Sequence, residues 1–272
     1  MAGAMVALLL KYCNDWHAIF YVPGIIAIIA SIYIFLSLRD SPSCAGLPSI
    51  EEYKKEKSRA VSNTSNKHWY IIKKYILKNP YIWYLCLVVC FTQMVRFSTS
   101  DWATKFLYEA RGIDKIKVVY LWNISFLLGM PGGLLGGYLA SRFFKGFCSI
   151  VLLTYLFLLA CVIYLYILFA GADNFLLTCV LIGSISFFVD GICVLGEVII
   201  LRLTVREASA TVTGITGGVS YILGSALGAN FLAVYIIKFH GCNALYYLCI
   251  GCVIVSMLLC SLCIKKEYSN CL

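Results

Sequence analysis

The sequence predicts an all-α membrane protein, and its composition and its pattern of apolar stretches both lead to that class. Hydrophobic residues make up 61% of the 272-residue chain, whereas charged residues make up only 13%. With a mean hydropathy of +0.88, the chain has too few polar side chains to cover a soluble globule. Several apolar stretches approach or exceed the roughly 20 residues that a helix needs to cross the hydrocarbon of a bilayer.

Seven stretches are long and apolar enough to be membrane-spanning helices. They are residues 21–38, 81–100, 118–139, 149–170, 175–201, 212–237 and 243–264. Residues 1–10 are apolar too, but ten residues reach only about 15 Å, or half a bilayer. A signal peptide would carry basic residues before its apolar core, whereas Lys11 follows this one. We therefore expect residues 1–11 to be the last turns of a helix whose beginning is missing.

A polar, proline-containing segment separates the first span from the other six. It begins with the sequence RDSPSCAGLPSIEEYKKEKS at residues 39–58. The sequence therefore predicts three parts: helical residues 1–38, a linker at residues 39–80, and a six-helix transmembrane bundle at residues 81–272.

The distribution of lysine and arginine predicts the orientation in the membrane. Of the 22 such residues, fifteen fall on the side of the linker, six fall in the opposite loops, and Arg96 lies inside a span. The positive-inside rule then places the linker and the C-terminus in the cytoplasm. The formal net charge of +9 reflects this topology, so we expect the lipid bilayer as a partner and no nucleic acid.

The fourteen cysteines raise the question of a metal or disulfide framework. Most lie inside the apolar spans, as in the pairs Cys249 with Cys252 and Cys260 with Cys263, where a thiol behaves as a small hydrophobic group. The sequence also contains no phosphate-binding loop and no nucleophile with a base nearby. We therefore expect neither a metal nor a cofactor, and we do not expect an enzyme.

Two spans are rich in glycine, which lets helices approach one another closely in lipid. The glycines of residues 118–139 are Gly129, Gly132, Gly133, Gly136 and Gly137, and those of residues 212–237 are Gly214, Gly217, Gly218, Gly224 and Gly228. If the six spans after the linker form two triplets, each glycine-rich span is the middle member of its triplet. This pattern is typical of inverted three-helix repeats in transporters, although ordinary tight packing would also explain the glycines.

Charged residues are scarce within the spans, so each one suggests a function. Arg96 lies deep enough that exposure to lipid would be unfavourable, and we expect it to face a cavity unless it snorkels to the surface. Arginine suits a phosphate because its planar group donates two parallel hydrogen bonds. Asp190 and Glu197 are seven residues apart on one face of their span. They could pair with Arg96, carry a proton or approach Arg202.

Three motifs carry a resemblance to a known family: NDWHAIFYVPG at residues 14–24, RDSPSCAGLPSIEEYK at 39–54, and VRFSTSDW at 95–102. Together they resemble the organophosphate:phosphate antiporters of the major facilitator superfamily, the glycerol-3-phosphate and hexose-phosphate transporters. The resemblance implies a fold of twelve helices in two halves, joined by the polar segment. It assigns this chain the end of helix five, helix six and the C-terminal six-helix half, in a bacterial inner membrane.

The resemblance also implies a substrate-binding set. Arg96 matches the substrate-binding arginine of the family's helix seven, Asp101 matches the acid that follows it, and Tyr221 matches a tyrosine that lines the central pathway. Gln93 and Asp190 stand where the glycerol-3-phosphate branch carries tyrosines.

Two further positions depart from the family pattern. Ser141 replaces a usual aspartate, and Phe126 stands where an acid is expected. We therefore expect a pocket of altered chemistry.

The function that the resemblance implies is the exchange of an organophosphate, a hexose phosphate or glycerol-3-phosphate, for inorganic phosphate. The family's second pocket arginine belongs to helix one, which this chain lacks, so we expect a missing or separately encoded N-terminal half as a partner. A hexose-phosphate sensor on the same scaffold and an inactive truncated remnant remain alternatives.

Overall fold

The computed structural model describes residues 17–39, 46, 79–105, 107, 108, 112, 115–143, 147–169, 175–204 and 208–271. The chain divides into two units, Met1–Thr64 and Ser65–Leu272, and each is described by itself. Every regular element in the described residues is helical, so the predicted all-α class is confirmed.

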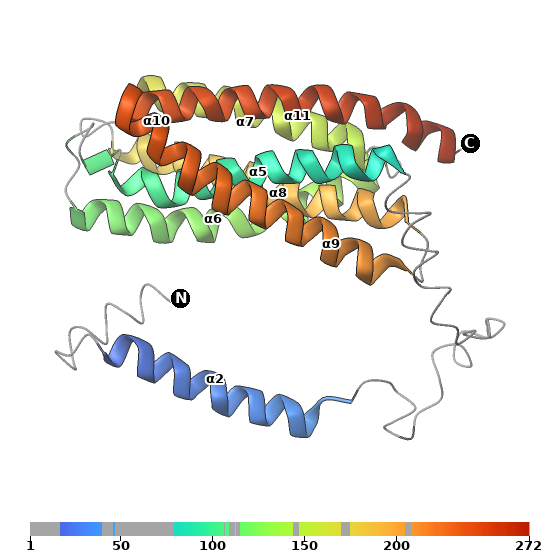
Figure 1. Cartoon of the computed structure of the whole chain (residues 1–272), viewed down its shortest axis with the longest axis horizontal. Coiled ribbons are helices and arrows are strands. Elements are labelled where there is room, and N and C mark those ends of the chain that lie inside the picture. The colour runs from blue at the N-terminus through green and yellow to red at the C-terminus, as the bar shows by residue number, and fades with distance from the viewer. Residues whose placement is uncertain are drawn as a thin grey trace. The chain divides into compact units, whose positions relative to one another are not determined.

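The first unit contains one described helix, α2 (Ala18–Ser37), drawn in blue in Figure 1. Its 20 residues extend about 30 Å, which matches the thickness of bilayer hydrocarbon. The side chains from Gly24 onward in this helix are all exposed, and most of them are apolar, as expected of a surface that faces lipid. The predicted span at residues 21–38 is thus confirmed as a helix. Residues 1–10 and nearly all of the predicted linker lie outside the described residues.

The second unit is a bundle of long helices, and each predicted span corresponds to one helical stretch. The elements are α5 (Pro80–Lys105), α6 (Lys115–Arg142), α7 (Cys148–Phe169), α8 (Phe175–Arg202), α9 (Ser209–Tyr221), η5 (Ile222–Leu232), α10 (Ala233–His240) and α11 (Cys242–Cys271). The last predicted span but one is built from α9, η5 and α10 in succession, and η5 is a π-helix.

Six helical stretches in the described part are long and apolar enough to cross a membrane: α2, α5, α7, α8, α11 and the stretch Ser209–His240. Helix α6 is not among the six, although it is 28 residues long. The side chains of residues 115–122, at its start, lie outside the described part. Its helical state is confirmed, and its crossing of the membrane stays a prediction.

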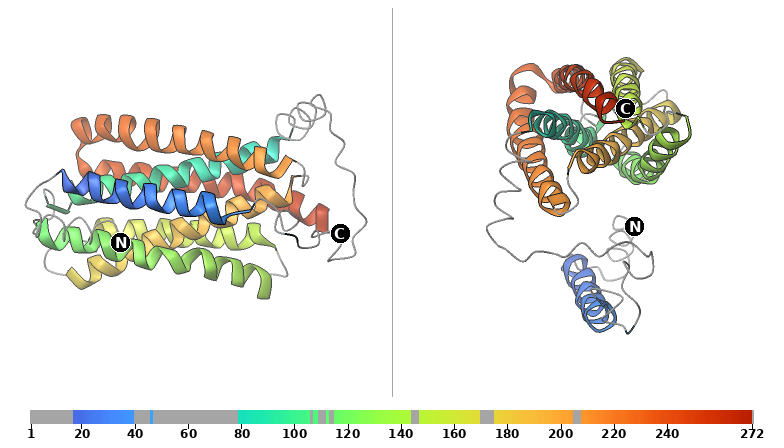
Figure 2. Two further views of the ribbon diagram at one scale, coloured as in Figure 1. Left: turned by 90° about the horizontal axis from the view of Figure 1, so that it is seen from below. Right: turned by 90° about the vertical axis from the view of Figure 1, so that its right-hand side faces the viewer.

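The neighbours of each helix define the bundle. Helix α6 packs on α8, α8 on α7, α7 on α11, α11 on α5, and α5 on η5, while α5 also contacts α8 directly. Figure 2 shows this arrangement along the helices in its right-hand view, with α5 and α8 between the two glycine-rich helices. Helices α5 and α8 therefore form the shared centre of the unit.

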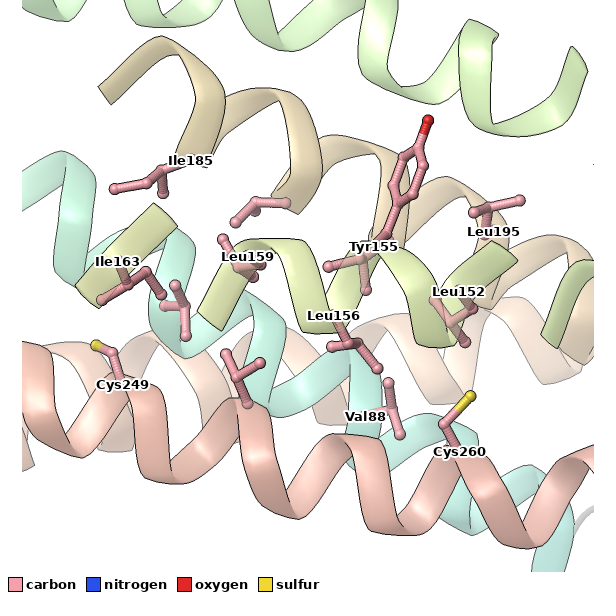
Figure 3. Close-up of a cluster of buried hydrophobic side chains, with 14 of the residues drawn as sticks. Val88, Leu152, Tyr155, Leu156, Leu159, Ile163, Ile185, Leu195, Cys249 and Cys260 are labelled. Atoms are coloured by element: carbon pink, nitrogen blue, oxygen red, sulfur yellow. The ribbon is translucent and has the colours of Figure 1, made fainter. Parts of the chain in front are cut away.

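The core of this unit is formed where α7 lies against its neighbours. Leu152, Leu156, Leu159 and Ile163 of α7 are almost completely buried, and they recur every three or four residues, as one face of a helix requires. Figure 3 shows these side chains beside Val88 of α5, residues of α8, and Cys249 and Cys260 of α11. In lipid, such contacts stabilise the bundle mainly through close van der Waals packing.

The glycines of α6 lie where α6 crosses α8. A Cβ atom at Gly132 would overlap the carbonyl oxygen of Phe187, and one at Gly133 would lie 3.0 Å from a methyl carbon of Val194. The absence of side chains therefore lets the two helices approach each other closely.

The glycines of η5 allow the same close approach between η5 and α5. A Cβ atom at Gly224 would lie 2.5 Å from the carbonyl oxygen of Cys90, and one at Gly228 would lie 2.8 Å from Met94 Cγ. Each glycine-rich helix thus packs on the first helix of the other triplet, so the two triplets make equivalent contacts with each other. Internal repeats would produce such equivalence, and their inverted orientation stays a prediction. Gly214, Gly217 and Gly218, by contrast, would meet no atom within 4 Å.

Hydrogen bonds connect α5 to the α9–η5 stretch at two places, near Cys86 and at Trp102. Ser220 Oγ lies 3.3 Å from the carbonyl oxygen of Cys86 and shares its one proton between that oxygen and the nearer carbonyl oxygen of Thr216, at 2.6 Å. Trp102 Nε1 donates to the carbonyl oxygen of Ala229 at 3.0 Å. The close glycine contacts lie between these two places along α5, so this interface is held on both sides of them.

Candidate functional site

Two of the charged residues that the sequence placed inside the spans, Arg96 and Asp190, meet where α5 and α8 contact each other. Arg96 Nη2 of α5 lies 3.3 Å from Asp190 Oδ1 of α8. The two side chains are 32% and 25% exposed, so both are largely surrounded by protein. Of the partners considered for Asp190, the structure therefore brings Arg96 to it.

Pairing explains how two charges can be accommodated at this depth. A charged side chain near the centre of a bilayer costs about 2.5–3.5 kcal/mol on insertion scales, and such residues face the interior of a bundle and pair with one another. The pair uses one arginine nitrogen and one carboxylate oxygen, whereas a guanidinium group has five N–H donors. Arg96 therefore retains donors that a ligand could use.

Gly129 of α6 provides the space for the Asp190 carboxylate. A Cβ atom at Gly129 would overlap Asp190 Oδ2 and would lie 3.5 Å from Ser186 Cβ. The carboxylate thus has Arg96 on one side and the bare backbone of α6 on the other. The sequence marked Gly129 as part of a glycine-rich span but did not assign it to the site, because a glycine by itself gives no sign of which side chain fills its space.

Gln93 lies one turn before Arg96 on α5 and is only 3% exposed. Its Oε1 atom has no hydrogen-bond partner among the described residues. On the side of η5, a Cβ atom at Gly224 would lie 3.0 Å from Gln93 Cβ. A buried acceptor without a donor is unfavourable, so this amide is suited to a ligand group that carries a hydrogen, such as a hydroxyl.

Tyr221 closes α9 and is 48% exposed. Its ring packs edge-to-face on Phe97 of α5, with the two centroids 6.0 Å apart. The structure therefore brings Tyr221 to Phe97, the residue that follows Arg96.

Asp101 is also on α5 and is exposed. Five residues after Arg96, it lies about 140° further around the helix and about 7.5 Å further along it. It therefore occupies a different face of α5 from Arg96. Among the five predicted site residues, Arg96 and Asp190 are in direct contact, whereas Asp101 is placed apart from them.

The two departures from the expected pattern both lie on α6. Phe126 is 43% exposed, and Ser141 Oγ donates to the carbonyl oxygen of Tyr138 at 3.0 Å. Neither side chain carries a negative charge. Within the described part, Asp190 supplies the carboxylate of the ion pair at the bundle centre.

The sequence profile of the Major Facilitator Superfamily matches residues 1–229 of the chain. The chain belongs to this superfamily. The match covers more than three quarters of the 272 residues, and it agrees with a bundle in which glycine-rich helices flank a charged centre. The protein is therefore a multi-pass membrane protein of the superfamily, as the resemblance implied.

The chain is similar to curated bacterial proteins that are named as transport proteins or as a membrane sensor. It is 29% identical over 250 residues to the glycerol-3-phosphate transporter of Bacillus subtilis, a match that covers 90% of this chain and 55% of that protein. It is 26% identical over 278 residues to the probable hexose phosphate transport protein of Chlamydia trachomatis, covering 95% of this chain and 60% of that one. It is also 28% identical over 249 residues to the membrane sensor protein UhpC of Escherichia coli, covering 87% and 54%.

These matches show that the predicted family resemblance was correct. The chain spans little more than half the length of the curated relatives it matches, between 54 and 60% in these three cases. The relatives' names also cover both transport and sensing.

Proposed function

We propose that this chain forms part of a carrier that moves an organophosphate, a hexose phosphate or glycerol-3-phosphate, across a membrane in exchange for inorganic phosphate. The observation that carries the proposal is Arg96, an arginine inside a span, held by Asp190 at the contact of the two central helices. The names of the relatives support a phosphorylated small molecule as the substrate. Transport of an intact substrate also needs no catalytic residues.

In this proposal, Arg96 binds the phosphate group and the neighbouring polar residues bind the rest of the molecule. The buried Gln93 amide accepts a hydrogen bond from a substrate hydroxyl, and the Tyr221 ring lines the path beside Phe97. Alternating access in this superfamily requires two halves that rock about a central site. A missing or separately encoded N-terminal half is therefore the partner.

The test of the proposal is the substitution Arg96→Lys, measured in a complex reconstituted in liposomes with an N-terminal half. Lysine keeps the positive charge but loses the two-pronged geometry, so we expect phosphate-driven exchange to fall by at least a hundredfold while the protein still inserts. Arg142→Lys, an exposed position in the last turn of α6, is the matched control and should exchange at the normal rate. Asp101→Asn should reduce exchange less than Arg96→Lys does. Exchange near the normal rate in Arg96→Lys would refute the assignment.

The second candidate function is sensing, which is favoured by the similarity to the sensor protein of Escherichia coli. A sensor would bind a hexose phosphate without carrying it across the membrane. The same liposomes distinguish the two functions, because a sensor would bind labelled hexose phosphate and yet show no exchange above that of empty liposomes.

We further propose that the chain resides in a bacterial inner membrane with its C-terminus in the cytoplasm. The excess of fifteen of the 22 lysines and arginines on the linker side supports this orientation. Green fluorescent protein fused to the C-terminus should fluoresce in intact bacteria, whereas a fused periplasmic alkaline phosphatase should be inactive. The opposite pair of results would show that the topology is inverted.

A further inference from the structure

Three residues from three helices meet at the centre of the bundle: Arg96 of α5, Asp190 of α8 and Gly129 of α6. One oxygen of the Asp190 carboxylate lies 3.3 Å from Arg96 Nη2. The other oxygen occupies the space that a side chain at position 129 would need. The carboxylate is therefore positioned by both neighbouring helices at once.

This carboxylate and a phosphate would compete for the same guanidinium group. Both are anions that bind arginine through charge-assisted hydrogen bonds, and two anions on one guanidinium repel each other. The observed pair joins a single nitrogen to a single oxygen, without the two parallel bonds that make an arginine–carboxylate pair strong. A phosphate that engages two nitrogens could therefore replace Asp190.

We propose that Asp190 is the counter-ion of Arg96 in the substrate-free state, that the phosphate group of the substrate displaces it, and that Gly129 positions it for this role. The inference rests on the proposed function, because it takes Arg96 to be the residue that binds phosphate. While they are paired, Arg96 and Asp190 carry no net charge between them. Binding replaces the carboxylate with the phosphate. The interaction between Arg96 and Asp190 is lost in that step, so it lowers the affinity of the site for phosphate.

A substitution at Gly129 can test this proposal without removing any charge. A methyl group at position 129 would overlap Asp190 Oδ2, so Gly129→Ala would push the carboxylate away from its place beside Arg96. Gly137 lies on the same helix, and a Cβ atom there would meet no atom within 4 Å. Gly137→Ala is therefore the matched control for the change from glycine to alanine in α6.

The experiment measures the binding of labelled inorganic phosphate to the chain reconstituted with the same N-terminal half in lipid nanodiscs, by equilibrium dialysis. Asp190→Asn removes the competing charge, and we expect the dissociation constant for phosphate to fall about tenfold. Gly129→Ala displaces the same carboxylate and should lower the constant several-fold, whereas Gly137→Ala should leave it unchanged. Arg96→Gln should abolish binding. Structural damage would weaken binding, so a tighter complex distinguishes the proposed role from a structural one.

The other outcomes would contradict the inference in whole or in part, and the Arg96→Gln variant shows whether the proposed function fails with it. If Arg96→Gln abolishes phosphate binding but Asp190→Asn leaves it unchanged or weakens it, Asp190 is not a competitor, while the role of Arg96 stands. If phosphate binds equally well to Arg96→Gln, the role of Arg96 fails, and the inference fails with it. If all variants elute as folded monodisperse protein and none binds phosphate, the inference and the proposed role of Arg96 are both refuted. A Gly129→Ala variant that binds like Gly137→Ala would refute the role of Gly129 alone.

Discussion

The two glycine-rich interfaces of the bundle share one backbone design but enclose different polar side chains. Where α6 crosses α8, Gly132 faces the carbonyl of Phe187, and Asp190 follows that residue by three positions. Where η5 crosses α5, Gly224 faces the carbonyl of Cys90, and Gln93 follows by three positions. One interface therefore contains a carboxylate, whereas the equivalent place in the other contains a neutral amide.

This difference shows that the same close packing of helices at glycine can position side chains of different chemistry. Close backbone contact at a glycine brings the residue one turn later to the inner side of its helix in both interfaces. Arg96 lies three residues after Gln93 and extends to α8, where it pairs with Asp190. The repeated packing fixes where the polar groups lie, and their chemistry decides which of them form the charged pair.

The largest expected effect on this comparison comes from Gly132→Ala. The added Cβ atom would overlap the carbonyl oxygen of Phe187, and backbone atoms cannot rotate away. We expect a loss of about 3 kcal/mol, the upper end of the usual cost of overpacking, visible as a lower melting temperature of the purified protein in detergent. Gly137→Ala should not lower the melting temperature. Equal melting temperatures for the two variants would show that α6 and α8 are not closely packed at Gly132.

Gly224→Ala tests the other interface in the same way. Its Cβ atom would lie 2.5 Å from the carbonyl oxygen of Cys90, a less severe overlap, so we expect a loss of about 1–2 kcal/mol in the same assay. Gly217→Ala in α9 is the matched control because a Cβ atom there would meet nothing within 4 Å. A Gly224→Ala protein as stable as this control would mean that only one of the two interfaces depends on glycine.

Trp102→Phe removes the hydrogen bond that fastens α5 to η5 beyond the glycine contacts. The indole N–H donates to the carbonyl oxygen of Ala229 at 3.0 Å, and losing such a bond costs about 1 kcal/mol. We expect a correspondingly smaller fall in melting temperature. Trp83→Phe, near the opposite end of α5, controls for the change in ring size. A fall of the same size in both variants would assign the effect to the ring rather than to the bond.

The smallest expected effect comes from Ser220→Ala at the other end of the same interface. Ser220 Oγ lies 3.3 Å from the carbonyl oxygen of Cys86, and hydrogen bonds between membrane helices contribute about 0.6 kcal/mol on average. Urea unfolding in mixed micelles should resolve this difference. Ser220 also donates to the carbonyl oxygen of Thr216 in its own helix, at 2.6 Å. Ser184→Ala controls for the loss of such a bond, because Ser184 Oγ donates within its own helix, to the carbonyl oxygen of Val180 at 2.7 Å. Greater stability in Ser220→Ala than in the control would exclude a fastening role for Ser220.

Much of the fold could be predicted from the sequence because helix formation in a membrane is a local matter. An apolar stretch in hydrocarbon must satisfy its own backbone hydrogen bonds, and a helix does so within one segment. For this reason the predicted span at residues 149–170 agrees to within one residue at each end with α7 (Cys148–Phe169). The π-helical form of Ile222–Leu232 was not predicted, because no local pattern in the sequence distinguishes it from an α-helix.

The candidate site was determined only in part by the sequence. Composition and spacing showed that Arg96 and Asp190 lie inside spans, and the seven-residue spacing placed Asp190 and Glu197 on one face of α8. That spacing could not choose between the two acids, since both repeat on the same side of the helix. Only the tertiary structure brought Asp190 to Arg96, opened the space at Gly129 and enclosed Gln93 against η5. The reason is physical: between membrane helices, van der Waals fit decides which helices meet, and that fit depends on residues far apart in the chain.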